Sequence, residues 1–324
     1  MDSNSKIYDI PNIVYHYTSP SGLLGIVDNE KDHENAKLWF TRCDSLNDKS
    51  ERCDIQKVLK KYKELRKDTI PKEFRDVIED LINTEVTKWK LPPILWRHST
   101  DVLNYLSLDE PDPINIYICS FSIYGDSLPM WNYYSKSNHY EGYALGIDSA
   151  KWKENIENLN GYTLDIRRII YQEEAKIDEL DKIVSECNQS LEIAQRYQTI
   201  VGLKHVKYDF LCQIAELQFY FKDEHFSHEN EVRAILQIPK DKDVSGKEAA
   251  KDKDVSNNKV ITKYRAGNGY IIPYMEVPVP KEAITSVTVG PLLEKELAKK
   301  NVKEMLESRG YSCKVHTSEV PIRF

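Results

Sequence analysis

The stretch VYHYTSPSGLLGIV, residues 14–27, predicts a short buried strand that turns directly into an apolar helix. Ser19 is a favourable N-cap residue, and Pro20 suits the first helical position, where no amide hydrogen is needed. Side chains alternate across a strand, so His16 and Thr18 share one face. A histidine on a buried face needs a polar partner. His16 therefore has two interpretations, a satisfied core residue or a group that anchors a ligand.

The composition limits the class of protein. The 324 residues carry a formal net charge of −7, and the pI of about 5.7 argues against indiscriminate binding to phosphate backbones. No apolar run approaches the roughly 18 residues of a membrane span, and the N-terminal segment lacks the features of a secretory signal. The cysteines form no CxxC pair and are predicted to be reduced. We expect a cytoplasmic protein with neither a membrane nor a metal partner.

Strand patterns frame the chain, and helical patterns interrupt them. The segments predicted as strands are 12–18, 37–41, 114–122, 142–148, 161–171, 231–238, 267–280, 284–291 and 313–317. The segments predicted as helices are 19–28, 51–67, 73–90, 129–136, 292–310 and two long helices within 173–222 that join near Gly202.

These segments predict one elaborated α+β domain over residues 1–324, with a mixed or antiparallel sheet as its core. Helical insertions are expected at about 49–106 and 173–222. A flexible charged loop is expected at about 239–259, where the sequence KDKDVS occurs twice.

Two polar clusters accompany the strand that holds His16. The segment Ser45–Glu51, with Asn47 and Asp48, is typical of a turn or a helix cap, and it also suits the rim of a site. The segment 127–148 gathers several polar-tipped rings. Most aromatic rings lie in cores, yet so many beside polar residues would also suit a pocket that stacks a flat heterocycle.

The segment HFSHENEVR, residues 225–233, holds two carboxylates at the start of a predicted strand. Glu229 and Glu231 are two residues apart, so extended backbone projects both from one face. Neighbouring carboxylates repel, which raises the proton affinity of one and leaves the other ionised, a division that catalysis uses. Arg233, next on that face, would instead neutralise them in a structural row of ion pairs.

Three further hypotheses remain open. A metal-dependent hydrolase would use His225, His228 and Glu229, although neither HExxH nor HxxEH occurs. A phosphoesterase of the two-histidine kind needs two His-x-Thr motifs, and the sequence holds one, at His16. A non-enzymatic interaction or regulatory module is favoured if His16 is buried and satisfied and if the carboxylates pair with Arg233.

Several motifs, in chain order, resemble the uncharacterised bacterial family known as domain of unknown function 2971. They are VYHYTSPSGLLGIV, LWFTRCDSLND with a following glutamate, CSFS, LPMWNYYS, HYEGYALGID, HENEVR and VTVGP. The resemblance extends from about residue 13 to residue 291. It implies a bacterial origin and no particular activity.

A more distant resemblance is to the ADP-ribosyltransferase plan of histidine, tyrosine and glutamate. It rests on a strand with histidine and a small hydroxyl residue, a following helix, and a much later glutamate at a strand start. The resemblance implies that His16 binds a ribose hydroxyl of NAD and that Glu231 serves the reacting ribose. Tyr134 or Tyr133 would stack on nicotinamide. Glu229 and Glu231 match the two-glutamate form of the motif, but the sequence shows no clear serine-threonine-serine strand.

The same resemblance implies an ADP-ribosyltransferase-like fold with a large helical insertion, and NAD as the substrate. It implies transfer of ADP-ribose to a protein or nucleic-acid acceptor, as in a toxin or an anti-phage defence effector, with an NAD glycohydrolase as the alternative. The helical insertions would be available to a protein partner. The other residues expected to bind the cofactor are Tyr17, Thr18, Thr41, Asn47, Asp48, Trp131 and Arg233.

The residue types fit this chemistry. Cleavage of the nicotinamide–ribose bond passes through an oxocarbenium-like state, and a nearby carboxylate stabilises its positive charge. We expect Glu231 to take that role, Glu229 to orient or deprotonate the acceptor, and His16 with Thr18 to hold the cofactor. The sequence therefore predicts that His16, Tyr134 and Glu231 line one cleft.

Overall fold

Strand β3 (Ile114–Ser122) organises the sheet in the computed structural model. The structure describes residues 10–27, 35–46, 53–89, 114–135, 141–157, 163–197, 200–239, 262–267, 269–291 and 294–321. The predicted site residues Asn47 and Asp48 lie outside these ranges, as does nearly all of the charged loop predicted at about 239–259.

The described strands form one ten-stranded sheet. Besides β3 they are β1 Ile13–Thr18, β2 Asn35–Arg42, β4 Tyr143–Asp148, β5 Thr163–Arg168, β6 Glu231–Pro239, β7 Lys263–Gly267, β8 Tyr270–Pro280, β9 Ile284–Val289 and β10 Lys314–Thr317. Strands β9 and β10 run parallel, and the other described pairs are antiparallel. The predicted α+β class with a mixed sheet is therefore confirmed.

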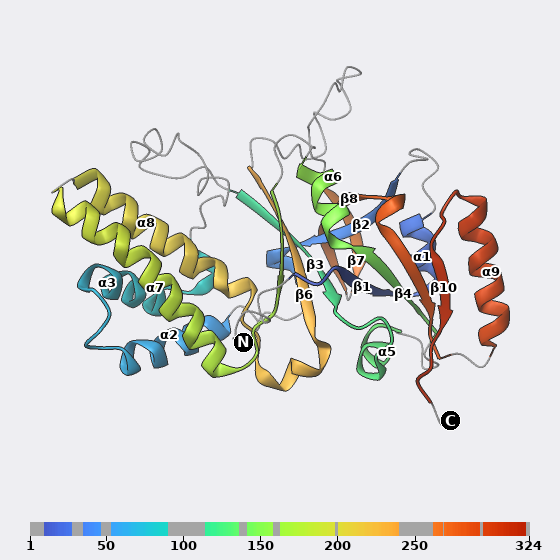
Figure 1. Cartoon of the computed structure of the whole chain (residues 1–324), viewed down its shortest axis with the longest axis horizontal. Helices are drawn as coiled ribbons and strands as arrows, with labels where there is room; N and C mark the ends of the chain where they lie inside the picture. The colour runs from blue at the N-terminus through green and yellow to red at the C-terminus, as the bar shows by residue number, and fades with distance from the viewer. Residues whose placement is uncertain are drawn as a thin grey trace, which may run out of the picture.

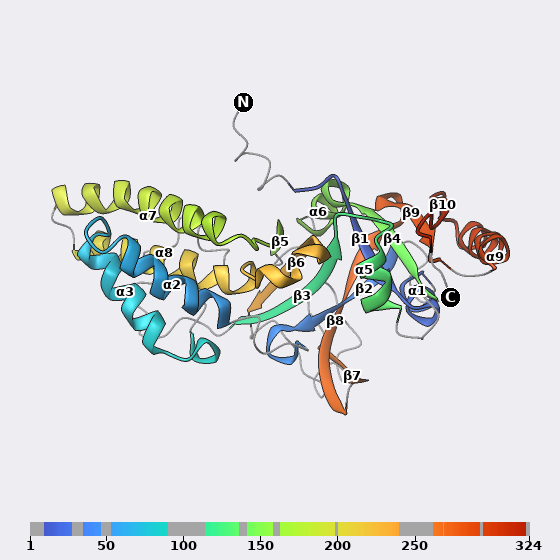
Figure 2. The same cartoon turned by 90° about the horizontal axis from the view of Figure 1, so that it is seen from below.

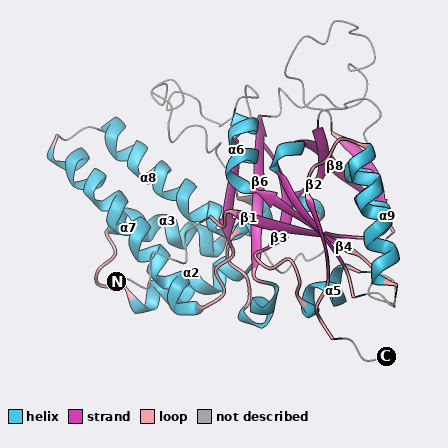
Figure 3. Ribbon diagram, turned by 45° about the vertical axis from the view of Figure 1, so that its right-hand side comes forward, coloured by secondary structure: helices cyan, strands magenta, loops and turns pink. Residues whose placement is uncertain are grey.

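Helices flank the sheet on several sides. The described α-helices are α1 Pro20–Val27, α2 Asp54–Leu65, α3 Lys72–Asn83, α5 Leu128–Tyr134, α6 Ser149–Glu157, α7 Glu173–Arg196, α8 Ile200–Glu216 and α9 Lys295–Ser308. Ser19 caps α1 as predicted, since the amide of Gly22 donates to its hydroxyl at 3.1 Å. Figure 3 shows α2, α3, α7 and α8 together at one end of the sheet and α9 at the other.

The structure differs from the sequence expectations at three places. Neither β7 nor α6 was expected, because their segments, KYRAG and SAKWKENIE, carry too few apolar residues for a clear period. The two long helices do not join near Gly202. Instead α7 ends at Arg196 and α8 begins at Ile200, so Gly202 lies in the first turn of α8.

Helices α2, α3, α7 and α8 share an apolar core of their own, beside the sheet (Figure 1). Within it the rings of Phe74 and Phe210 stack with their centroids 4.3 Å apart. Helices of the two predicted insertions thus pack on each other, while the single-domain assignment stays a prediction. Of the helices that the structure describes, none combines the length and apolar character needed to cross a bilayer.

Strand β3 divides the sheet in two. Along one edge it pairs with β6 over its whole length. Along the other edge Ser122 lies opposite Tyr15 of β1, whereas Ile118 lies opposite Thr41 of β2. Two wings therefore leave the same strand, a first wing of β1, β4, β9 and β10 and a second wing of β2, β8 and β7 (Figure 2). We call the part of β3 between them, around Ser120, the fork.

The main apolar core covers one face of the sheet, which we call the core face. Val14 and Leu145 of the first wing and Phe40 of the second wing belong to the same buried cluster. Helix α6 joins the wings, since Trp152 lies in this cluster and its Nε1 donates to the carbonyl oxygen of Pro278 at 3.0 Å. The core therefore fixes the two wings relative to each other around the fork.

Candidate functional site

The strand register decides which predicted site residues share a face of the sheet. Tyr15 lies opposite Ser122, and Ser122 lies opposite Glu231. Directly opposed residues of antiparallel strands lie on one face, and neighbours along a strand lie on different faces. Tyr15 and Glu231 therefore share what we call the polar face, whereas His16 and Thr18 lie on the core face. The prediction that His16 and Glu231 line one cleft is wrong.

His16 instead supports the fork. Its Nδ1 donates to the carbonyl oxygen of Ser120 at 3.2 Å, at a place where neither β1 nor β2 has a residue paired with β3. Burial lowers the pKa of the imidazole, and the hydrogen bond to Ser120 opposes that shift, so the ring is neutral near pH 7. The histidine of the opening strand is thus a positioning residue that supplies the hydrogen bond a neighbouring strand would otherwise give.

Four charged side chains form a buried cluster on the polar face, which we call the Glu231 cluster: Lys222, Glu229, Glu231 and Arg233. Each is at most 8% exposed. Lys222 Nζ lies 2.6 Å from Glu229 Oε2 and 3.0 Å from Glu231 Oε2. Arg233 donates from Nε to Glu231 Oε1 at 2.7 Å and from Nη2 to Oε2 at 3.2 Å. Two cations therefore balance two carboxylates.

The environment keeps Glu231 ionised. Burial by itself raises the pKa of its carboxyl, but the charges of Arg233 and Lys222 and the hydrogen bonds outweigh burial and lower that pKa to about 2. We expected repulsion between the carboxylates to raise one pKa, but Lys222 lies between them and relieves it. Arg233, predicted to bind the cofactor, is committed to Glu231 in the ion-pair row that was the alternative interpretation.

Glu229 reaches the cluster from a turn and not from a strand. It ends the 3₁₀ turn Glu224–Glu229, and Asn230 after it has left-handed backbone with φ 46°. The extended geometry predicted for this pair of glutamates is therefore wrong at Glu229. No motif in the sequence indicated Lys222, which brings the two carboxylates together.

Two serines of β3 hold the cluster against the fork. Ser120 Oγ donates to Glu231 Oε1 at 2.6 Å, and Ser122 Oγ donates to the carbonyl oxygen of Glu229 at 2.9 Å. No serine-threonine-serine strand is evident in the sequence, but the two serines keep the i, i+2 spacing that puts both on one face. That spacing, within CSFS, is the sequence signal for them.

The second wing adds an arginine to the polar face. Thr41 lies opposite Ile118, two residues from Ser120, and so shares its face. Arg265 Nη2 donates to Thr41 Oγ1 at 3.0 Å, and its guanidinium lies 5.6 Å from the centre of the Trp39 ring. Its Nε is buried without a hydrogen-bond partner, and no carboxylate of the described ranges forms an ion pair with it. Among the residues that the structure describes, the charge of Arg265 beside the fork therefore has no carboxylate partner.

The predicted aromatic residues divide into two groups. Tyr17 and Trp131 are at most 5% exposed, and their rings meet edge-to-face at 4.7 Å. Trp131 Nε1 donates to Asp126 Oδ1 at 2.8 Å, so these two rings have the environment of core residues. Tyr134 is 37% exposed and lies with its ring centre 6.5 Å from that of Tyr17. Of the three, Tyr134 is the most exposed.

The histidines of the metal hypothesis do not converge. His225 is exposed, and its Nδ1 lies 2.6 Å from Asp223 Oδ1, while His228 stacks on Tyr133 with the ring centres 5.5 Å apart. Within the described part of the chain, no group of three or more His, Cys, Asp or Glu side chains is placed to hold a metal ion. This geometry gives the metal-dependent hydrolase hypothesis no support.

Comparison with known proteins bears on the same region. A family model described as "Protein of unknown function (DUF2971)" matches residues 130–234. The match supports the resemblance of the chain to the DUF2971 family. It covers the part of the chain that holds Lys222, Glu229, Glu231 and Arg233, whereas β1 and β3 precede it. No curated protein and no solved structure matched the chain.

Proposed function

We propose that the chain is an ADP-ribosyltransferase-like enzyme, with a sheet core of that type, which cleaves the nicotinamide–ribose bond of NAD and transfers ADP-ribose to a macromolecular acceptor. The observation that carries the proposal is the 2.6 Å hydrogen bond from Ser120 Oγ to Glu231 Oε1. It orients a carboxylate that its neighbours keep ionised, beside the fork of the sheet.

The chemistry asks for a fixed negative charge. The bond between ribose C1′ and the nicotinamide nitrogen breaks, and its electron pair leaves with nicotinamide, so positive charge develops on the ribose. A preorganised carboxylate stabilises that charge without reorganising. The acceptor then adds to C1′ and loses a proton, and Glu229, which shares Lys222 with Glu231, would accept it. Water as the acceptor would make the chain an NAD glycohydrolase.

Two residues of the polar face suit the binding of NAD. Arg265 carries a guanidinium that forms no ion pair within the described ranges, and a guanidinium is the group that pairs best with phosphate oxygens. Arg265 donates a hydrogen bond to Thr41 of β2, a residue expected to bind the cofactor. Its guanidinium would meet the diphosphate of NAD. The partly exposed Tyr134, one of the two tyrosines expected at this position, would stack on nicotinamide. His16 would support β3 from behind, and neither His16 nor Thr18, both on the core face, would contact the cofactor.

The burial of Glu231 sets a condition on this proposal. Its side chain is 4% exposed, and Lys222 lies over it with the Nζ 5.0 Å from the centre of the Phe226 ring. NAD therefore reaches Glu231 only when Lys222 and the turn that follows it move aside.

An activity that damages NAD pools or modifies a macromolecule would fit a toxin or an anti-phage effector. The helices α2, α3, α7 and α8 would be available to a protein partner.

The test is release of nicotinamide by the purified chain, with cell extract as the source of acceptors and without it. Glu231→Gln keeps shape but loses charge, and should lower the rate at least roughly a hundredfold, as loss of a preorganised charge does. Ser120→Ala should lower kcat with little change in KM. Arg265→Met should raise KM for NAD, whereas Lys263→Met, an exposed neighbour on β7, should not.

A second candidate function is a non-enzymatic interaction or regulatory module. The observation that favours it is the complete neutralisation of Glu229 and Glu231 by Lys222 and Arg233 inside the protein. If wild type and Glu231→Gln release nicotinamide at the same background rate under every acceptor condition, the enzyme proposal fails. The Glu231 cluster is then a structural element only.

A further inference from the structure

Strand β2 leaves its largest side chain, Trp39, outside the main core. Side chains alternate along the strand, and the neighbours Leu38 and Phe40 are fully buried in that core. Trp39 points to the other side, shares the polar face with Thr41, and is 43% exposed. The indole therefore lies on the same face of the sheet as Glu231.

Trp39 also lies where β2 parts from β3. The described pairing of these strands runs through Thr41, which is opposite Ile118. The same register, carried two residues further along both strands, leads to Trp39 on β2 and to Ser120 in the fork. Ser120 Oγ donates to Glu231 Oε1 at 2.6 Å. Trp39 thus borders the fork from the second wing, on the face that carries the Glu231 cluster.

Two neighbours hold the indole in place. The buried Tyr274 of β8 has its ring centre 4.7 Å from that of Trp39. Arg265 of β7 brings its guanidinium carbon to 5.6 Å from the centre of the Trp39 ring. The 3.0 Å hydrogen bond from Arg265 Nη2 to Thr41 Oγ1 fixes this guanidinium over β2. Because Arg265 Nε is closed to solvent, a ligand would meet the terminal nitrogens of the guanidinium.

The pair of groups indicates a chemical class of ligand. An indole stacks on flat heterocycles, and a guanidinium pairs with phosphate oxygens. A nucleoside diphosphate carries both partners, and a purine offers more ring area for stacking than a pyrimidine does. With the diphosphate on Arg265, a base can reach the ring of Trp39, since the two side chains lie next to each other.

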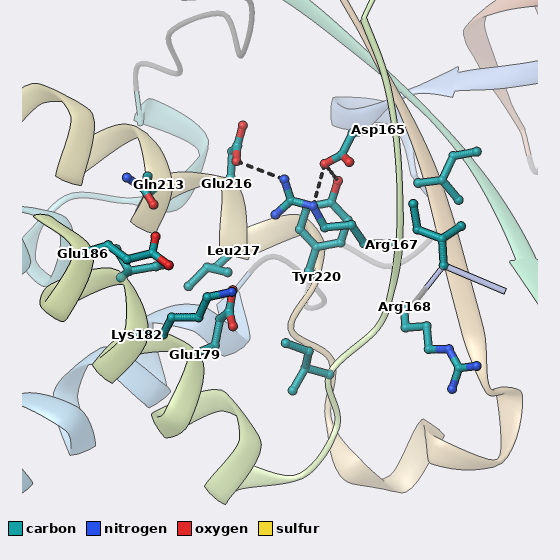
Figure 4. Close-up of a pocket in the computed structure, with 14 residues that line it drawn as sticks. Asp165, Arg167, Arg168, Glu179, Lys182, Glu186, Gln213, Glu216, Leu217 and Tyr220 are labelled. Atoms are coloured by element: carbon teal, nitrogen blue, oxygen red, sulfur yellow. Dashed lines mark hydrogen bonds and ion pairs between the residues drawn. The ribbon is translucent and has the colours of Figure 1, made fainter. Parts of the chain in front are cut away.

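The pocket of about 330 Å³ between β5 and α7 suits a diphosphate less well. Its lining includes the carboxylates of Asp165, Glu179, Glu186 and Glu216. Figure 4 shows the Arg167 guanidinium between two of them, with Nε 2.7 Å from Asp165 Oδ2 and Nη2 3.8 Å from Glu216 Oε2. An added anion would have to compete with these carboxylates for Arg167.

We propose that Trp39 stacks on the adenine of NAD while Arg265 holds the diphosphate. The proposal rests on the proposed function and names the part of the site that takes the adenosine end of the substrate. Trp39 is then a binding residue that sets the preference for a purine dinucleotide, and it has no part in breaking the nicotinamide–ribose bond.

The test is calorimetric titration of the purified full chain with two probes, ADP and inorganic pyrophosphate. Trp39→Leu should lower the affinity for ADP at least about tenfold, as loss of a base-stacking ring does, and should leave the affinity for pyrophosphate unchanged. Trp39→Phe keeps a ring and should recover most of the ADP affinity. Arg265→Met should weaken both probes. Tyr264→Leu removes an exposed ring from the opposite face of β7 and should change neither.

Two results would overturn the proposal. One is equal affinity for ADP in wild type and Trp39→Leu. The other is no ADP binding at millimolar concentration by a wild-type chain whose cooperative thermal unfolding shows that it is folded. If Trp39→Leu fails to fold, Trp39→Gln takes its place, because a polar side chain is tolerated at an exposed strand position.

ADP binding needs no turnover, so this test is separate from the test of the enzyme. ADP binding that depends on Trp39, without release of nicotinamide by wild type, supports this site and ends the enzyme proposal. Release of nicotinamide with the same KM for NAD in wild type and Trp39→Leu supports the enzyme and overturns the role of Trp39.

Discussion

Replacing Glu231 by glutamine should destabilise the fold in a pH-dependent way, whether or not the chain is an enzyme. The carboxyl pKa falls from its ordinary 4.5 to about 2 on folding. One pKa unit corresponds to about 1.4 kcal/mol, so ionised Glu231 contributes on the order of 3 kcal/mol to the free energy of unfolding. The same loss can be estimated from the cations, since at pH 7 the variant leaves one of them uncompensated, which costs about 3–5 kcal/mol for buried pairs.

The sign of the pH dependence follows from the direction of the shift. Because folding lowers this pKa, the unfolded chain binds the proton more tightly. The stabilisation is complete above about pH 4.5 and is lost as the pH falls toward about 2. The difference in unfolding free energy between wild type and Glu231→Gln should therefore be large and constant from pH 7 to pH 5 and should shrink below pH 4.5.

Urea unfolding at a series of pH values, followed by circular dichroism, measures this difference. Glu304→Gln is the matched control, since Glu304 is 64% exposed and pairs with Lys300 at 3.9 Å. It should change stability by less than about 0.5 kcal/mol at any pH. A loss at pH 7 below about 1 kcal/mol for Glu231→Gln, or a loss that does not change between pH 7 and pH 4, would refute the electrostatic account of the cluster.

Three other perturbations test other parts of the structure by the same unfolding assay. Lys176→Met should cost about 3–5 kcal/mol, because it leaves buried Asp54 without the cation that lies 2.5 Å away, and Lys176→Met with Asp54→Leu should recover part of that loss. Gly22→Ala should destabilise the fold, because the new Cβ would lie 2.0 Å from the threonine hydroxyl at the end of β1. Gly25→Ala in the same helix is the matched control: its Cβ meets nothing within 4 Å, and it should stabilise the fold by up to about 1 kcal/mol. His16→Ala should cost about 1–3 kcal/mol by removing the partner of a carbonyl at the fork; a loss under about 0.3 kcal/mol would argue against its positioning role.

The sequence pattern was sufficient for most elements of the sheet. Alternation of apolar residues predicted the strands around His16 and Glu231, and the Ser19-Pro20 pair predicted where α1 begins. Strand β7 was missed because its residues are mostly exposed, so that no buried face marks it. Pairing with β8 makes it a strand, and pairing is a property of two segments that one segment alone does not encode.

The candidate site was predictable only within single strands. Alternation placed His16 and Thr18 on one face of their strand. Whether Glu231 lies on that face depends on the register through β3, and it lies on the opposite face. Lys222 and Arg265 come from segments without any motif, and they enter the site because the chain folds back over the sheet. Contacts between residues far apart in sequence follow from tertiary packing, and local periodicity carries no information about them.

The fork also has a consequence for synthesis of the chain. Strand β1 pairs with β3 and β4, and strand β2 pairs with β3 and β8, so neither of these first two strands pairs with the other. Both leave the ribosome before any partner exists, and their edges stay open until residues 114–122 follow. Long-range pairing of this kind slows folding, and unpaired edges favour aggregation. A nascent chain halted before β3 should therefore depend on chaperones more strongly than one halted after β4.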